Sequence, residues 1–126
     1  MSPARVMIVE DEAITAMATG AMLKRLGHEV LASVASGEAA LEACRERRPD
    51  LVLMDIRLDG KLDGIETARL IHESEENVPV VFVSAYVDDQ TRRRAAATNP
   101  LAFVAKPLDE VDLGRLLRLL ESKPRG

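Results

Sequence analysis

The sequence predicts an α/β fold built on a doubly wound, five-stranded parallel sheet. Three observations indicate it: apolar runs of strand length alternate with helix-period segments, the alternation repeats five times, and the run Leu51–Met54 is wholly apolar. A strand buried on both faces has such a run. Strict alternation implies parallel strands joined by right-handed helical crossovers, and hence a (βα)5 three-layer sandwich.

The first two strand-helix pairs are marked by apolar runs and by helix-ending residues. The run Arg5–Val9 predicts a strand, and the helix-period segment after it ends at Gly27. This helix is expected to bury an apolar face formed by Ile14, Met17, Ala18, Ala21 and Met22. A second strand is predicted over Val30–Val34. Ser36 is the expected N-cap of the next helix, which runs to about Arg47.

The run Leu51–Met54 is expected to be the central strand, and a glycine-containing loop over 56–63 follows it. The remaining elements continue the alternation of helix and strand. They are predicted over Ile65–Ser74, Val80–Val83, Asp88–Thr98, Ala102–Ala105 and a last segment in which Leu113, Leu116, Leu117 and Leu120 share one helix face. One domain is therefore expected over residues 4–121, with 122–126 as a disordered tail or linker remnant.

Composition excludes several classes of protein. The 126 residues are 47% hydrophobic and 30% charged, with a net charge of −4. No apolar run approaches the roughly 18 residues of a membrane span, and the first residues do not resemble a secretory signal, so a cytoplasmic location without membrane contact is expected. The lone Cys44 and the two histidines lack metal-ligand spacing. Net negative charge argues against direct nucleic-acid binding, and the run 92–94 of three arginines is interpreted as a solvated helix face.

Residues capable of chemistry follow the predicted strands. Glu10 and Asp11 follow the first strand, Asp55 ends the third, Ser84 the fourth and Lys106 the fifth. Each has a structural explanation if taken alone, such as an acid at a helix N-terminus, a turn or cap residue, or a lysine-proline entry to a helix. However, ligands of such sheets bind outside the carboxyl ends of the strands, where the strand order reverses. These residues are therefore expected to share one crevice.

The expected crevice favours a divalent cation and phosphoryl chemistry. Three carboxylates placed together repel one another unless a cation occupies the site, and oxygen ligands beside a phosphate favour Mg²⁺. Lys106 supplies a second positive charge, and the Ser84 hydroxyl can donate to a phosphoryl oxygen. Asp55 follows the most apolar strand, so it is the predicted nucleophile of an aspartyl phosphate.

Five segments of the chain resemble the signature segments of response-regulator receiver domains, and the match extends over most of the sequence. These segments are Val6–Glu12, Leu53–Ile56, Asp63–Gly64, Val83–Tyr86 and Ala105–Pro107. The resemblance implies a flavodoxin-like, chemotaxis-regulator-like domain of a two-component phosphorelay that is a phosphoprotein switch and not an enzyme. It also implies a phosphohistidine donor on a sensor histidine kinase or phosphotransfer protein.

The resemblance implies further roles for individual residues. Glu10, Asp11 and Asp55 would hold Mg²⁺ together with the backbone carbonyl of Arg57, and a cis peptide would join Lys106 to Pro107. Ser84 and Phe103 would form the switch. The fourth helix, fifth strand and last helix would form the surface for a downstream effector or an attached output domain, or for a homodimer.

The sequence departs from the family pattern at three places. The loop Arg57–Leu62 lacks the usual proline and is one residue longer, Asn99–Pro100 replaces Gly-Ala, and Phe103 stands where tyrosine is frequent. Switching is therefore expected to depend on packing. Arg57 and Tyr86 either shield the phosphate from water or lie at the surface, and both interpretations stay open.

The sequence argues against two alternative functions. A pseudo-receiver would keep the fold without phosphorylation, but the acceptor, acidic, hydroxyl and lysine positions are all intact. An aspartate-dependent phosphatase would need a second aspartate two residues after Asp55, where this chain has Arg57. Cys44 falls in the apolar register of its helix and is interpreted as a packed thiol.

Overall fold

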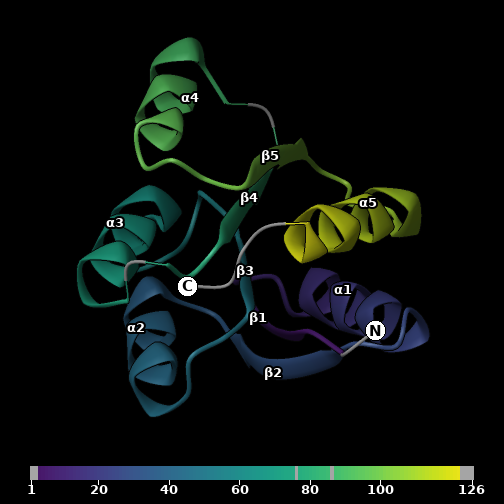
Figure 1. Ribbon diagram of the computed structural model, residues 1–126. Helices are drawn as coiled ribbons and strands as arrows, with labels where there is room; N and C mark the ends of the chain where they lie inside the picture. The colour runs from purple at the N-terminus through teal and green to yellow at the C-terminus, as the bar shows by residue number, and fades with distance from the viewer. Residues whose placement is uncertain (1–2, 76, 86, 123–126) are drawn as a thin grey trace.

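The computed structural model describes residues 3–75, 77–85 and 87–122, and within them five strands alternate with five helices (Figure 1). In chain order the elements are β1 Arg5–Val9, α1 Ala13–Arg25, β2 Glu29–Val34, α2 Gly37–Glu46, β3 Leu51–Met54, α3 Gly64–Ser74, β4 Val80–Ser84, α4 Asp89–Ala96, β5 Ala102–Ala105 and α5 Glu110–Glu121. The strands form one sheet in the order β2-β1-β3-β4-β5, and every neighbouring pair is parallel. The predicted doubly wound fold is confirmed.

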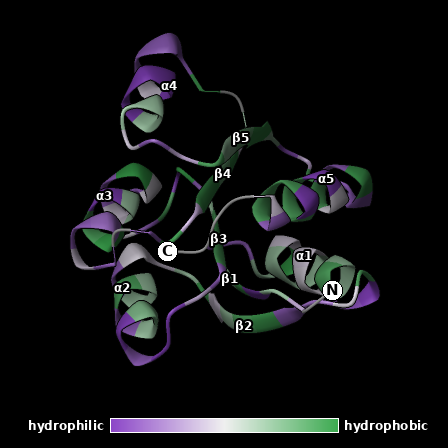
Figure 2. Ribbon diagram, viewed as in Figure 1, coloured by the Kyte–Doolittle hydropathy of each residue, from purple (hydrophilic) through white to green (hydrophobic). Residues whose placement is uncertain are grey.

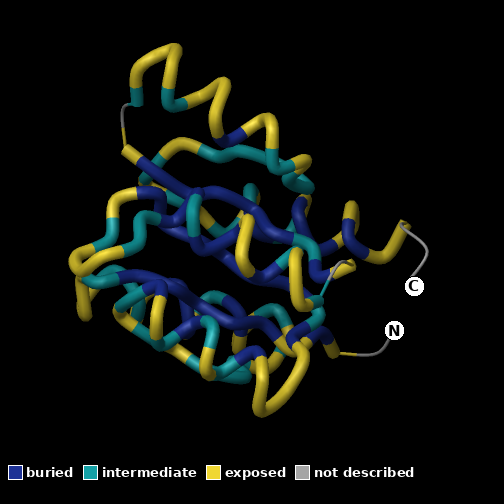
Figure 3. The backbone as a smooth tube through the Cα atoms, turned by 90° about the vertical axis from the view of Figure 1, so that its left-hand side faces the viewer, coloured by how far each residue is buried: buried dark blue, intermediate teal, exposed yellow. Residues whose placement is uncertain are grey.

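The sheet is the middle of three layers. Helices α1 and α5 cover one face, and α2, α3 and α4 lie on the other (Figure 1). Strand β3 shows how the two cores are divided, because Val52 and Met54 belong to the α2-α3-α4 side while Leu51 and Leu53 belong to the α1-α5 side. The three inner strands β1, β3 and β4 are consequently apolar and largely buried, whereas the edge strands are half-buried and the helices expose a polar outer surface (Figures 2 and 3).

Helix N-termini are fixed by the side chains that the sequence places there. The Ser36 hydroxyl accepts from the Ala39 amide at the start of α2. At the start of α3, Asp63 accepts from the Glu66 amide at 2.8 Å and Glu66 accepts from the Asp63 amide at 3.0 Å, which is a capping box. The next residue, Gly64, lies so close to β3 that a Cβ there would collide with the Asp55 carbonyl oxygen. Glycine at this position therefore lets α3 begin directly beside the end of β3.

The predicted apolar face of α1 is wrong. Ile14 and Met17 are 84% and 74% exposed, and the helix instead buries Thr19, Gly20 and Leu23. Alanines occupy much of this helix and express little preference for either face, so apolar spacing did not decide its rotation. The face of Gly20 lies toward the sheet, where a Cβ would be at an ordinary contact distance of 3.6 Å from Val30 of β2. The opposite outcome holds for α5, where all four predicted leucines are buried.

Helix α4 is shorter than predicted. It ends at Ala96 and not at Thr98, and Asn99 takes a left-handed conformation with φ of 57° before Pro100. A residue before proline avoids the helical region, and asparagine tolerates positive φ better than most residues, so this pair ends the helix. The peptide between Lys106 and Pro107 is cis, as the resemblance implied.

The expectations for the C-terminal tail and for Tyr86 fall mostly outside the described residues. Ser122 is the C-cap of α5, and the rest of the expected tail, 123–126, lies outside the described residues. Tyr86 also lies outside them. Across the described part of the chain, no helix combines the length and the apolar character that crossing a membrane requires.

Candidate functional site

The candidate site lies at the carboxyl ends of β1 and β3, where the strand order reverses. Glu10 and Asp11 directly follow β1, and Asp55 directly follows β3. The backbone joins the two strand ends, because the Asp55 amide donates to the Val9 carbonyl at 3.0 Å. Glu10 and Asp55 are both buried, so two carboxylates lie at one sheet edge with little access to solvent.

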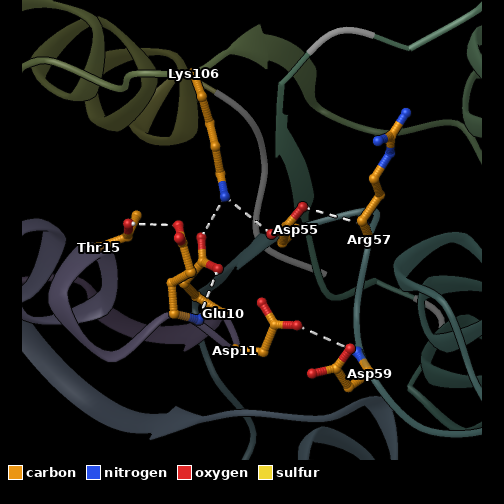
Figure 4. Close-up of polar contacts among 8 residues, drawn as sticks. Glu10, Asp11, Thr15, Asp55, Arg57, Asp59 and Lys106 are labelled. Atoms are coloured by element: carbon orange, nitrogen blue, oxygen red, sulfur yellow. Dashed lines mark hydrogen bonds and ion pairs between the residues drawn. The ribbon is translucent and has the colours of Figure 1, made fainter.

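Lys106 joins these two carboxylates from the end of β5. Its Nζ donates to Glu10 Oε1 at 2.6 Å and to Asp55 Oδ2 at 2.9 Å (Figure 4). Burial alone acts to lower the pKa of Lys106, but the hydrogen bonds and charges of Glu10 and Asp55 outweigh it and raise this pKa above its ordinary value. Burial also raises the pKa of Glu10, against the opposing effect of the Lys106 hydrogen bond. The lysine is therefore held as a cation between two acids.

Asp11 completes an acidic cluster with Glu10 and Asp55. One carboxylate oxygen from each lies within 4.8 Å of the others. Lys106 contacts Glu10 and Asp55, whereas Asp11 Oδ2 accepts from the Asp59 amide at 3.3 Å (Figure 4). Three carboxylates facing one amine leave net negative charge, and such oxygen ligands suit a hard cation such as Mg²⁺. The chemistry of this donor set fits a magnesium site.

Arg57 contacts the site through its backbone. Its amide donates to Asp55 Oδ1 at 3.1 Å, so the two oxygens of Asp55 are held by different partners. The side chain extends away from the carboxylates (Figure 4), and its charge helps to lower the pKa of Asp88, after the larger effect of hydrogen bonds from Thr91. The amide of Arg57 thus orients Asp55, while its guanidinium lies toward the start of α4.

Ser84 ends β4, the neighbouring strand. Ser84 is only 1% exposed, and its backbone carbonyl accepts a hydrogen bond from the Lys106 amide at 2.8 Å. Its hydroxyl is the one buried side-chain polar atom without a hydrogen-bond partner among the described residues. Buried hydroxyl groups are normally paired, so an unpaired one at the carboxyl end of the strand next to β3 indicates a group kept for a ligand.

Phe103 lies in β5 opposite Phe82 of β4, with ring centroids 6.3 Å apart. The guanidinium of Arg92, from α4, stands over the Phe103 ring at 4.7 Å from its centroid. Phenylalanine has no hydroxyl to bond, and a cation over the ring supplies an attraction of its own. The expectation that Phe103 depends on packing alone thus leaves out the contribution of Arg92.

A cleft of about 270 Å³ opens from the site between α1 and the segment after β5. Asp55 and Lys106 lie at its polar end, and Ile14, Met22 and Leu108 are among the apolar residues that line it. The exposed Ile14 side chain therefore stands at an entrance to the acidic cluster.

The predicted residues are brought together to different degrees. Glu10, Asp11, Asp55 and Lys106 form one cluster, Ser84 adjoins it through the backbone of Lys106, and Phe103 lies on the other side of β4, toward α4. The predicted role of the Arg57 carbonyl as a metal ligand stays a prediction. Sequence reasoning missed the Asp59 amide and Arg92. No sequence signal marks either, since an amide donor is common to nearly all residues and the arginine contact spans two separate elements.

A family model for the response regulator receiver domain matches residues 6–118. The chain belongs to this family. The mycobacterial transcriptional regulatory protein PdtaR from Mycobacterium tuberculosis is 33% identical to this receiver domain over 123 residues, which cover 98% of the chain and 59% of PdtaR. The chain spans between 23% and 59% of the length of the curated relatives compared with it.

Solved structures show the same fold. The signal receiver domain of a modulated diguanylate cyclase from Desulfovibrio desulfuricans G20 has a TM-score of 0.88 and 35% identity, with 94% of both chains covered. The receiver domain of sensor histidine kinase PA1611 from Pseudomonas aeruginosa PAO1 has a TM-score of 0.85 and 31% identity, covers 96% of this chain and 100% of its own, and contains a magnesium ion in its active-site cleft. Receiver domains are typically phosphorylated on aspartate, bind Mg²⁺, and interact with kinases or phosphotransfer proteins and with output domains.

Proposed function

We propose that this receiver domain accepts a phosphoryl group on Asp55 from the phosphohistidine of a sensor histidine kinase or phosphotransfer protein. The observation that carries the proposal is the placement of Asp55. Its carboxylate is buried, bonded to the Lys106 amine and grouped with two further acids. A carboxylate fixed in this way is a positioned nucleophile beside a cation that can neutralise an incoming phosphoryl group.

The chain's own groups have distinct roles in the transfer. A carboxylate oxygen of Asp55 forms the new bond to phosphorus, the phosphorus-nitrogen bond breaks, and its electron pair returns to the donor imidazole. The Arg57 amide holds one oxygen of Asp55 at 3.1 Å and Lys106 holds the other at 2.9 Å, so the carboxylate does not rotate freely. The unpaired Ser84 hydroxyl is available to a phosphoryl oxygen once the group has arrived.

Mg²⁺ is the proposed cofactor, held by Glu10, Asp11, Asp55 and the backbone carbonyl of Arg57. When bound, it would neutralise charge on the carboxylates and on the transferring phosphoryl oxygens. The acidic cluster supports this, because its only described amine is that of Lys106, which contacts two of the three carboxylates. Catalysis of a further reaction is not proposed. Asp55, Lys106 and Ser84 serve phosphorylation of the domain itself, and Arg57 occupies the place where a phosphatase would carry its general acid.

The readout is proposed to run through Ser84 and Phe103. When the Ser84 hydroxyl moves to the phosphoryl group, it frees space into which Phe103 can rotate, and that rotation must break the contact with Arg92. Switching would therefore alter the face formed by α4, β5 and α5. This face would contact a downstream effector, an attached output domain or a second copy of the chain.

The donor is proposed to dock on α1, because the cleft that reaches Asp55 begins there. Ile14 and Met17 are large apolar side chains exposed on this helix, and Ile14 lines the cleft. A donor helix with apolar residues beside its phosphohistidine would cover them while presenting the phosphoryl group to the cleft. Replacing both by serine should slow transfer from a phosphohistidine donor at least tenfold and leave labelling by acetyl phosphate unchanged. Equal slowing with both donors would contradict this docking surface.

The proposal extends to the location of the protein and to the bounds of the domain. We propose a receiver unit over residues 4–121 that acts in the cytoplasm without binding nucleic acid or membrane directly. The net charge of −4 supports this view, and the described arginines of α4 are engaged locally, with Arg92 over Phe103 and Arg94 paired with Asp63 at 3.2 Å.

The proposed acceptor can be tested with acetyl phosphate and a gel that retards phosphoproteins. Wild-type protein should be labelled with Mg²⁺ and not with excess EDTA, and Asp55→Asn should abolish labelling. Asp59→Asn is the matched control, because Asp59 lies in the adjoining loop and contacts the cluster through its amide alone. Normal labelling of Asp55→Asn would overturn the assignment.

A further inference from the structure

The loop between β3 and α3 contacts the acidic cluster through backbone amides. Residues 56–63 contain no proline, so every backbone nitrogen in the loop carries a donor. The Arg57 amide donates to Asp55 and the Asp59 amide to Asp11, at 3.1 and 3.3 Å. Two of the three clustered carboxylates therefore depend on the path of this loop for their orientation.

The far end of the same loop is bonded to α2. The Leu62 amide donates to Glu38 Oε1 at 3.2 Å. Gly60 has a left-handed φ of 105°, and a Cβ there would lie 3.0 Å from Glu38 Oε2. A Cβ at Gly37, the residue before Glu38, would lie 3.0 Å from the Leu62 side chain and would collide with Thr67. The loop is thus folded closely against the first turn of α2, with the Glu38 carboxylate beside Gly60 and Leu62.

We propose that Glu38 is a positioning residue for the acidic cluster and acts on it through the loop 57–62. This inference rests on the proposed function. Outer hydrogen bonds that orient metal-binding carboxylates tune metal affinity. If Glu38 is removed, the segment from Asp59 to Leu62 loses its hydrogen bond to α2 and keeps only the packing of Leu62 on Gly37, so the Asp59 amide holds Asp11 less firmly. The cluster then has to be ordered by the cation when it binds.

A purely helical role for Glu38 makes a different prediction. Glu38 stands in the first turn of α2, where an acid favours the helix through its charge. Glutamine lacks that charge but keeps a side-chain oxygen that can accept from the Leu62 amide. Comparing Glu38→Gln with Glu38→Ala therefore separates the two roles. A matched control is Glu42→Ala, because Glu42 lies one turn later on α2 and pairs with Arg45 of its own helix at 3.5 Å.

The experiment is calorimetric titration of the full chain with Mg²⁺, with the amide resonances of Asp59 and Leu62 followed by NMR. Because one hydrogen bond of an exposed side chain is involved, Glu38→Ala should bind Mg²⁺ about three- to tenfold more weakly. Glu38→Gln should stay within about twofold of wild type, as should Glu42→Ala, by the same reasoning. The Asp59 and Leu62 amide resonances should shift in Glu38→Ala and not in Glu42→Ala.

Three results would overturn the inference: wild-type affinity in Glu38→Ala, equal weakening in Glu38→Gln and Glu38→Ala, or equal weakening in Glu42→Ala. Its failure is distinguishable from failure of the proposed function. If wild-type protein binds Mg²⁺ and the variants follow one of these patterns, the positioning role alone is wrong. If wild-type protein does not bind Mg²⁺, the magnesium site itself is wrong and the positioning role falls with it.

Discussion

Ser84 carries a prediction that separates a group kept for a ligand from one kept for the fold. Its hydroxyl is buried without a partner, and an unpaired buried polar group costs about 1–3 kcal/mol of stability. Ser84→Ala removes the unpaired hydroxyl and so restores this stability. It also leaves a cavity the size of one oxygen atom, which cancels a few tenths of a kcal/mol of that gain. The unphosphorylated variant is expected to be as stable as wild type or more stable by about 1–2 kcal/mol.

Thr67 provides the matched comparison. It is fully buried, and its hydroxyl donates to the Asp63 carbonyl at 2.7 Å. Thr67→Val keeps the shape of the side chain but leaves that carbonyl without its hydroxyl donor, so it should lower the free energy of unfolding by about 1–2 kcal/mol. Thr67→Val should thus lower the free energy of unfolding, whereas Ser84→Ala should leave it unchanged or raise it.

Urea unfolding followed by circular dichroism measures both effects, with and without Mg²⁺ and beryllofluoride as a phosphoryl analogue. A ligand that binds only the folded state stabilises it by an amount that grows with the logarithm of the ligand concentration divided by Kd. Wild type and Thr67→Val should gain similar stability from the analogue, and Ser84→Ala should gain clearly less. If Ser84→Ala loses as much stability as Thr67→Val without ligand, the hydroxyl serves the fold and the reasoning is refuted.

Three further predictions concern Lys106, the glycines of α3 and α5, and Cys44. Lys106→Met should reduce the rate of labelling by acetyl phosphate at least about 100-fold, because the amine that contacts Asp55 and neutralises charge there is lost; a rate within fivefold of wild type would contradict this. Gly64→Ala should lower the free energy of unfolding by about 2 kcal/mol or more, because the added Cβ collides with the Asp55 carbonyl. Gly114→Ala on α5 should raise it by about 0.5–1 kcal/mol, because the added Cβ there meets only one flexible arginine side chain. Equal urea midpoints for the two variants would count against the packing argument. Burial, aided by the charge of Glu75, raises the pKa of Cys44 from 9.0 to about 11. The associated stability is therefore complete below pH 9.0 and is lost as the pH rises through about 11, a decline that urea midpoints should show in wild type and not in Cys44→Ala.

The parallel, doubly wound sheet and the grouping of the site residues could be predicted from the sequence, because the physics there is local and directional. Apolar runs such as Leu51–Met54 have one stable environment, the middle of a covered sheet, and the residue after each run must then lie at the same sheet edge. That rule alone brought Asp55 and Lys106 into one crevice, although they are 51 residues apart.

Other features could not be predicted because they depend on how whole elements pack. Helix α1 buries Thr19, Gly20 and Leu23, so Ile14 and Met17 face solvent although their spacing suggested a core face. The contact of Arg92 with Phe103 depends on where α4 lies over β5. The early end of α4 does have a local signal, namely Asn99 before Pro100, although the helical composition extends to Thr98.

The central claim, that Asp55 takes the phosphoryl group with the aid of a cation in the acidic cluster, is tested most directly by mapping the modification. Protein treated with acetyl phosphate and Mg²⁺ can be reduced with borohydride, which converts an aspartyl phosphate to homoserine, and then digested for mass spectrometry. The reduced residue should be found at position 55 and should disappear when Mg²⁺ is removed. Reduction at Asp11 or Asp59, or equal reduction at Asp55 without Mg²⁺, would contradict the claim.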